Sequence, residues 1–254
     1  MINKQMQKPL KWTDYFLALA FLILAWYLLA EYLQRPFFPS PFAVLKVFLV
    51  QIANGSIVLH FLISTIRVLS SLGLAFLLAV PLGLAMGRIP GLDRILSPLV
   101  YLLYPLPKIV FLPLIIVLFG MGNLPKIFLI TLIVFFQVIV AARDAARDIP
   151  AQWVLAMRSL HASNYQVFQH LVWPVCLPKV FTALRVSLGT AIAVLFLAET
   201  FASTDGLGYF ILDSMERRAF TEMYSGILAM GLLGVLAYAL VDSLEVRLCH
   251  WNKL

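Results

Sequence analysis

Residues 149–178 read IPAQWVLAMRSLHASNYQVFQHLVWPVCLP, the longest polar interval in an otherwise apolar sequence. Apolar runs long enough to cross a bilayer lie on both sides of it. Apolar residues recur at helical spacing from Trp153 to Leu160 and again from Tyr165 to Val172, with a break at 161–164. The interval therefore predicts two short helices joined by a bend. They either meet a partner protein outside the membrane or lie on the lipid headgroups.

The composition assigns the chain to the membrane. Of its 254 residues, 62% are hydrophobic and 12% are charged, whereas soluble domains are nearer ~45–50% apolar. We expect an all-α polytopic membrane protein with about six transmembrane helices, because each crossing needs ~20 apolar residues. The predicted spans are 14–33, 59–86, 97–119, 127–142, 180–198 and 225–244.

The spans divide the chain into three parts. Residues 1–57 would form an N-terminal transmembrane helix followed by an amphipathic helix on the outer face. Residues 58–247 would form the core, with the 149–178 loop inside it, and 248–254 a cytoplasmic tail. No interval outside the membrane is long enough for a further domain.

The basic residues predict the orientation. With both ends inside, eleven of the 19 Lys and Arg residues are cytoplasmic, five are external and three lie within spans. Positive residues favour the cytoplasmic side, so the 149–178 loop is also placed there. The net charge of +7 is spread over loop ends, which does not indicate a nucleic-acid partner. Cys176 and Cys249 have no Cys or His at metal-ligand spacing, so neither a metal site nor a disulfide is expected.

The third predicted span contains Pro105, Pro107 and Pro113, with Lys108 among them. Prolines kink a helix, and a membrane tolerates this only against protein or a water-filled cavity. Lys108 would lie roughly 16 Å into the span, near the middle of the bilayer. It either packs against backbone carbonyls or lines a path for a polar solute, and we favour the path.

Two further features concern the second span. Arg67 is expected to reach the outer interface with its side chain and to bind nothing there. Gly83 and Gly87 form a small-xxx-small pattern that suits close helix packing.

Motifs that are missing from the sequence argue against several classes of function. No GxxxxGK[ST] loop is present, so the chain has no ordinary site for ATP phosphates and is not expected to be an ATPase. HExxH, GxSxG and paired intramembrane aspartates are also missing from the sequence, which disfavours an intramembrane enzyme. A scaffold subunit that transports nothing is a second alternative, against which the kinked third span with its lysine argues.

The 149–178 interval resembles the EAA loop of ABC-importer permeases. That motif reads Glu-Ala-Ala, three residues, Gly, nine residues, an aliphatic residue, one residue and Leu-Pro. The Glu and the Gly are both replaced here, so the bend at His161 must use ordinary backbone angles or a left-handed histidine. The matching positions are Leu155, Ala156 and Met157 for Glu-Ala-Ala, His161 for Gly, Leu171 for the aliphatic residue, and Trp173 with Pro174 for Leu-Pro.

Other segments resemble permeases of nitrate, sulfonate and taurine importers in the same order along the chain. They include Thr65-Ile66-Arg67-Val68, Pro105-Leu106-Pro107-Lys108, Phe119-Gly120-Met121-Gly122, Glu199 and Gly206-Leu207-Gly208-Tyr209. The resemblance implies a type I importer architecture in the cell inner membrane and no cofactor. It also implies a homodimer of permease copies, two cytoplasmic ATPases and an external substrate-binding protein.

The resemblance further suggests roles for particular residues. The solute would be small and anionic or polar, such as a sulfonate, nitrate, taurine or a vitamin precursor. The predicted coupling residues are Leu155, Ala156, Met157, Arg158, His161 and Pro174. The predicted residues of the translocation path are Lys108, Pro107 and Glu199.

Overall fold

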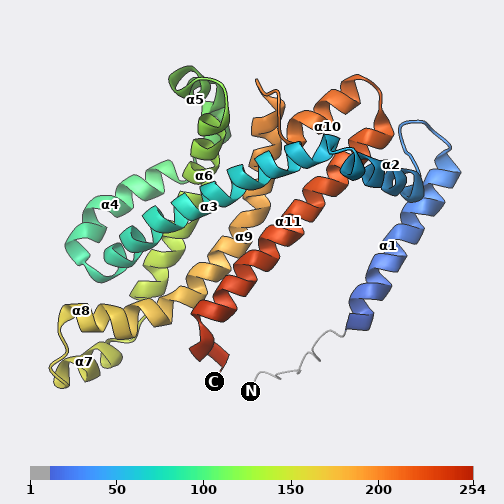
Figure 1. Cartoon of the computed structure of the whole chain (residues 1–254). Helices are drawn as coiled ribbons and strands as arrows, with labels where there is room; N and C mark the ends of the chain where they lie inside the picture. Colours follow the sequence, from blue (N-terminus) through green and yellow to red (C-terminus); the bar gives the residue numbers. More distant parts are fainter. Residues whose placement is uncertain (1–11, 254) are drawn as a thin grey trace.

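The computed structural model describes residues 12–253, and this part of the chain contains helices and no strand (Figure 1). The helices are α1 (Trp12–Leu33), α2 (Pro41–Ala53), α3 (Ser56–Arg88), α4 (Pro90–Leu103), α5 (Leu112–Phe119), α6 (Asn123–Arg147), α7 (Ala151–Ser159), α8 (Asn164–Val167), α9 (Trp173–Thr200), α10 (Leu207–Glu216) and α11 (Phe220–Leu248). Short 3-10 turns lie at Lys108–Phe111 and His250–Lys253, and a π turn at Phe168–Val172 joins α8 to α9.

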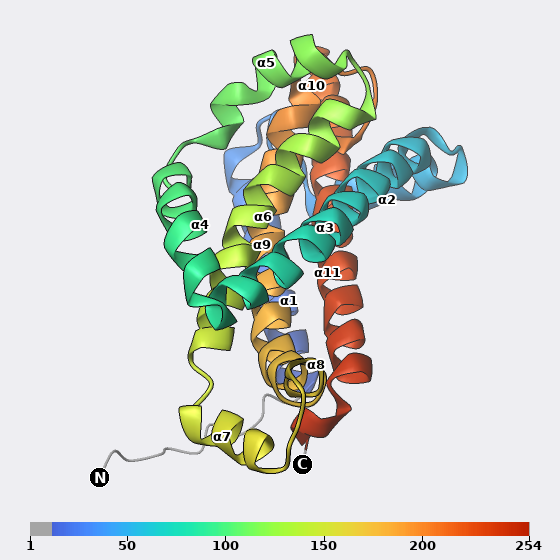
Figure 2. The ribbon, with the colours of Figure 1, turned by 90° about the vertical axis from the view of Figure 1, so that its left-hand side faces the viewer.

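Within residues 12–253, five helical stretches are long and apolar enough to cross a membrane, and they contain α1, α3, α6, α9 and α11. The fourth stretch runs from Asn164 to Thr200 and so includes α8 and the π turn. A sixth span is obtained if α4 and α5 count as one broken crossing, so the prediction of about six spans is confirmed. The third span differs from the single kinked helix that we expected. Its two halves bend by 81° at the proline-rich break, and α5 lies across the top of the bundle in Figure 2. The predicted outer amphipathic helix is α2.

The two ends of the bundle differ in what they carry. The start of α1, the end of α11 and the pair α7 and α8 lie at one end, while α5 and α10 lie at the other (Figure 1). This is the arrangement that the predicted topology requires, with the first end in the cytoplasm. We call the two ends inner and outer below.

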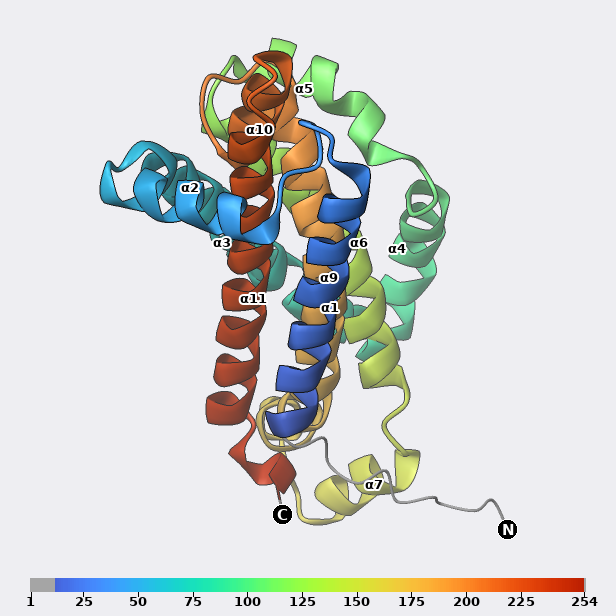
Figure 3. The same cartoon turned by 90° about the vertical axis from the view of Figure 1, so that its right-hand side faces the viewer.

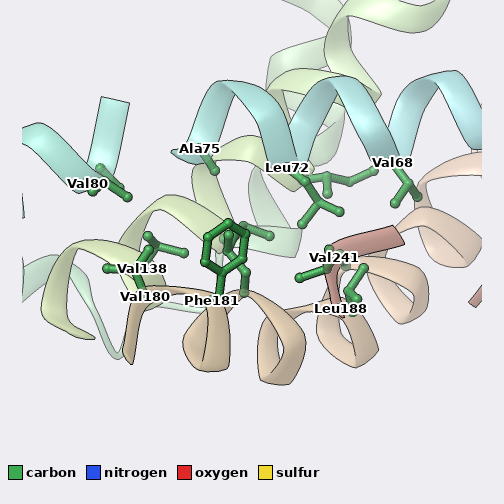
Figure 4. Close-up of a cluster of buried hydrophobic side chains, with 14 of the residues drawn as sticks. Val68, Leu72, Ala75, Val80, Val138, Val180, Phe181, Leu188 and Val241 are labelled. Atoms are coloured by element: carbon green, nitrogen blue, oxygen red, sulfur yellow. The ribbon is translucent and has the colours of Figure 1, made fainter. Parts of the chain in front are cut away.

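The core forms where α3 crosses α6 and α9. In Figure 4, Val68, Leu72 and Ala75 of α3 face Phe181 and Leu188 of α9. All five side chains are buried. Helix α1 stands at the side of this core (Figure 3).

Glycines allow a close crossing of α3 and α6. A Cβ atom added at Gly83 would lie 2.6 Å from the carbonyl oxygen of Ile139 and 2.8 Å from Cβ of Ala142. One turn later, a Cβ at Gly87 would overlap the backbone of Arg143 in the same way. The small-xxx-small prediction is therefore confirmed, and the two backbones approach because neither glycine has a side chain.

We expect Gly83→Ala to destabilise the protein by about 1–3 kcal/mol, because the new methyl group meets backbone atoms that cannot move away. Gly73→Ala is the matched control on the same helix. Its added Cβ would have no atom within 4 Å, so stability should stay equal or rise by up to about 1 kcal/mol. Thermal unfolding of the purified chains in detergent measures both. Equal melting temperatures for the two variants would show that the crossing can relax.

Candidate functional site

The 149–178 loop contains the two predicted helices, α7 and α8, joined by the predicted bend. His161 has a left-handed backbone with φ of 58°. The N–H groups of His161 and Ala162 donate to the carbonyls of Arg158 (2.9 Å) and Met157 (3.1 Å), which closes the end of α7. Of the two conformations proposed for His161, the left-handed one is therefore correct. The bend keeps the geometry that a glycine would adopt without strain.

A capping box starts the second helix of this loop. The Ser163 hydroxyl accepts from the N–H of Gln166 at 3.3 Å, and Oε1 of Gln166 accepts from the N–H of Ser163 at 2.8 Å. These two bonds satisfy donors that a helix start leaves free. The bend is thus defined on both sides by local hydrogen bonds.

The two faces of α7 have different surroundings. Ala156 and Arg158 are exposed, and 66% of the Leu155 surface is accessible. Val154 and Met157 are half-buried and pack on the core of the chain itself. Ala156 and Met157 are both predicted coupling residues, but they lie on different faces of α7. The outward apolar residues of α7 include Trp153, Leu155 and Ala156.

Pro174 lies at the base of the loop and is half-buried. Its carbonyl accepts a hydrogen bond from Nε1 of Trp251 at 3.1 Å, which attaches the end of the chain to the start of α9. The structure therefore brings Leu155, Ala156, Arg158 and His161 to one exposed element and places Pro174 beneath it.

We expect His161→Val to loosen this bend and His161→Gly to leave it intact. A β-branched residue in the left-handed region costs about 1–3 kcal/mol more than glycine does. Trypsin cleavage after the exposed Arg158 reports the opening, and His161→Val should be cut roughly tenfold faster than His161→Gly. Equal cleavage rates would mean that the bend is not held in this conformation in solution.

Lys108 lies at the break between α4 and α5. Its ammonium donates to the carbonyls of Leu103 (3.0 Å), Tyr104 (2.9 Å) and Leu106 (3.4 Å), and it lies 4.4 Å from the ring centre of Phe136. In a continuous helix the Leu103 carbonyl would accept from residue 107, which is a proline without an N–H. The lysine therefore supplies hydrogen bonds and positive charge to carbonyls at the break in the helix. Pro107 is exposed and begins the 3-10 turn of the break.

A buried ionic network at the outer end was not anticipated. The Arg67 side chain has no exposed surface, and its guanidinium donates to Oε1 of Glu199 (2.8 Å) and Oδ1 of Asn123 (2.8 Å). It also forms an ion pair with Asp205. The expectation that Arg67 reaches the interface and binds nothing is wrong, because these partners on α6, α9 and the α9–α10 loop replace the water that it would seek.

Glu199 is equally buried, with no exposed side-chain surface. Its carboxylate accepts from the Ser64 hydroxyl at 2.8 and 2.9 Å and from the N–H of Gly208 at 2.8 Å. In this conformation Glu199 is enclosed by its own chain and lines no open surface, unlike Lys108 and Pro107. Its position in the predicted path is therefore not supported by the geometry.

The α9–α10 loop closes over this network. Its backbone N–H groups donate to side chains of α3, from Leu207 to Oγ of Ser64 at 2.8 Å and from Gly206 to Nδ1 of His60 at 3.1 Å. Gly206 has φ of 98°, and an added Cβ would overlap both Glu199 and Arg67. The sequence contained one signal for this ionic network. Arg67 lies near the outer end of one predicted span and Glu199 at the outer end of another, and charged residues within membrane spans usually pair.

A second unpredicted ion pair joins α4 to α6 near the inner end. Nη2 of Arg143 lies 2.9 Å from Oδ2 of Asp93, and Nη1 lies 2.9 Å from the Tyr101 hydroxyl. This pair holds the first half of the broken span against the core.

Comparisons with known proteins agree with this architecture. The family described as binding-protein-dependent transport system inner membrane component matches residues 79–249. The taurine transport system permease protein TauC of Escherichia coli strain K12 is 33% identical over 193 residues, which cover 76% of this chain and 70% of TauC. The putative aliphatic sulfonates transport permease protein SsuC of Bacillus subtilis strain 168 is 31% identical over 206 residues, 80% of this chain and 73% of SsuC.

A solved structure shows the same fold. An inward-facing form of the MetNI methionine ABC transporter superposes with a TM-score of 0.65 at 20% identity, over 76% of this chain and 95% of that one. These similarities disfavour the alternatives of an intramembrane enzyme or a scaffold subunit. This multi-pass membrane protein belongs to the family of binding-protein-dependent transport system inner membrane components, the permease subunits of ABC importers.

Proposed function

We propose that this permease passes a small sulfonate such as taurine into the cell, driven by a separate cytoplasmic ATPase. The observation that carries the coupling part is the α7–α8 element, which stands at the inner end with its apolar Leu155 and Ala156 directed outward. The names of two relatives support the choice of substrate, because TauC is a taurine permease and SsuC is a putative permease for aliphatic sulfonates.

The α7–α8 element suits a socket on an ATPase. Hydrogen bonds at the left-handed bend and the capping box hold it, and the half-buried Met157 anchors α7 to the core. A rigid protruding element with a small apolar centre and a polar rim has the composition of a protein–protein interface. Arg158 and His161 would form the polar rim.

We place the solute path beside the break in the third span, along Lys108 and Pro107. The ammonium of Lys108 is the positive charge there, and a sulfonate is an anion. Its bonds to three carbonyls hold that charge in place, so the same lysine can stabilise the break and favour an anion beside it.

The proposed partners follow from the separation of solute transport and ATP hydrolysis between different subunits. One α7–α8 element per chain and two ATPases imply two permease copies, which we propose to be identical. An external substrate-binding protein would deliver the solute to the outer end, and the bacterial inner membrane is the proposed location.

The test is taurine uptake into proteoliposomes that contain the permease, its ATPase and its binding protein. ATP-dependent accumulation of taurine supports the proposal. Accumulation of a different solute would reject the substrate, and binding of ATPase without any uptake would reject the transport role.

In the same assay we expect Lys108→Met to lower uptake by about tenfold or more, because the variant loses the positive charge that would attract an anion beside the proposed path. Lys108→Arg keeps the charge and should retain most uptake. The ATPase should still bind both variants, since Lys108 is far along the chain from α7. Unchanged uptake by Lys108→Met would leave the lysine with a packing role only.

A further inference from the structure

The outer end of the molecule carries two adjoining clefts of about 760 and 720 Å³. They share Val47, Thr221 and Glu222 and lie between α2, α10 and the α10–α11 turn. We call the combined hollow the outer trough. Figure 1 shows α2 crossing between the outer ends of α1 and α11 beside α10.

The outer trough is richer in cations than in carboxylates. Lys46, Arg217 and Arg218 line it, against one carboxylate, that of Glu222. Arg217 lies 2.9 Å from Oδ2 of Asp213 and 3.3 Å from Oε2 of Glu222, so these acids are already engaged. Lys46 and Arg218 make no side-chain hydrogen bond or ion pair within residues 12–253. Two cations are therefore free to meet an anion.

The position of the trough indicates the kind of anion. Ser56 begins α3 and Phe220 begins α11, so the walls are the outer ends of membrane spans, at the level of the lipid headgroups. Phe37, Val47 and Phe220 supply apolar wall beside the cations. A phosphate next to apolar chains is the chemistry of a phospholipid, and basic pockets between spans bind lipid headgroups.

We infer that the outer trough is a binding site for an anionic phospholipid of the outer leaflet, whose headgroup phosphate lies between Lys46 and Arg218. Such a lipid would connect α2 to the α10–α11 turn. It would thereby support α2, which links the peripheral helix α1 to the core. This site is separate from the solute path and from α7.

The test measures lipid affinity of the full chain in a neutral detergent by native mass spectrometry. The probes are dioleoylphosphatidylglycerol, dioleoylphosphatidylcholine and inorganic phosphate. The tightest binding step should prefer the anionic lipid. Each cation near a membrane surface contributes roughly fivefold, so Lys46→Gln with Arg218→Gln should weaken that step by about 25-fold. Both side chains are exposed, so folding should be unaffected.

Arg94→Gln with Arg247→Gln is the matched control, because it removes the same charge from two exposed residues at the inner end. It should leave the tightest step unchanged. Three results would overturn the inference: equal losses in the two double variants, no preference between the two lipids, or displacement of the lipid by millimolar inorganic phosphate. A fourth result would also overturn it. If the Lys46→Gln, Arg218→Gln variant kept its lipid affinity but its ATP hydrolysis were no longer stimulated by the binding protein, the trough would instead be a binding site for an acidic protein surface.

Discussion

Ala156→Asp is expected to reduce ATP-driven uptake by roughly a hundredfold while the protein still inserts and folds. Ala156 is exposed on α7, outside the membrane spans, so a carboxylate there meets water in the free permease. In the proposed ATPase socket the same carboxylate would be enclosed without a partner. An unpaired buried charge costs about 3 kcal/mol or more, which corresponds to about a hundredfold in affinity.

The measurement is uptake and ATPase binding in proteoliposomes, with Ala156→Asn as the matched control. Asparagine has nearly the shape of aspartate without its charge, so it separates steric from electrostatic loss and should retain more activity. Folding is checked by the melting temperature of the purified chain, which should match that of the unaltered protein. Full uptake by Ala156→Asp would show that α7 does not couple to the ATPase and would favour its lying on lipid headgroups.

Much of the fold could be predicted from the sequence, because apolar runs and the distribution of basic residues can be read from short segments. The spans and the outer helix α2 needed only hydropathy and proline positions, and the glycine crossing of α3 with α6 followed from spacing at Gly83 and Gly87. The 81° bend between α4 and α5 could not be obtained in this way. Prolines predict that a helix breaks, but packing against α6 decides the direction of the second half.

The site was only partly predictable. The bend at His161 could be located from sequence, and the remaining choice between backbone conformations was settled by the hydrogen bonds that close α7. The inward turn of Met157 depends on how α7 docks on the core, which no local pattern encodes. Arg67 lies 132 residues from Glu199 and 138 residues from Asp205 in the sequence, so only the tertiary structure shows that it meets them.

Arg67→Met should be the most destabilising single change at the outer end, by about 3–5 kcal/mol. The methionine fills part of the space but leaves the carboxylate of Glu199 buried without its cation. It also removes the bonds to Asn123 and Asp205 that connect α3 to α6 and to the α9–α10 loop. The expected result is a large drop in melting temperature or loss of the protein from the membrane.

Arg217→Met is the control, since it breaks an exposed ion pair between Arg217 and Asp213 at the same end of the molecule. It should lower the free energy of unfolding by only about 0–1 kcal/mol. Combining Arg67→Met with Glu199→Met tests the pairing itself. Because the second change removes the orphaned charge, the double variant should lose less stability than the sum of the two single variants, by at least about 1 kcal/mol. Strictly additive losses would mean that the two side chains do not interact in the folded protein, and a small loss for Arg67→Met alone would mean that water reaches this network.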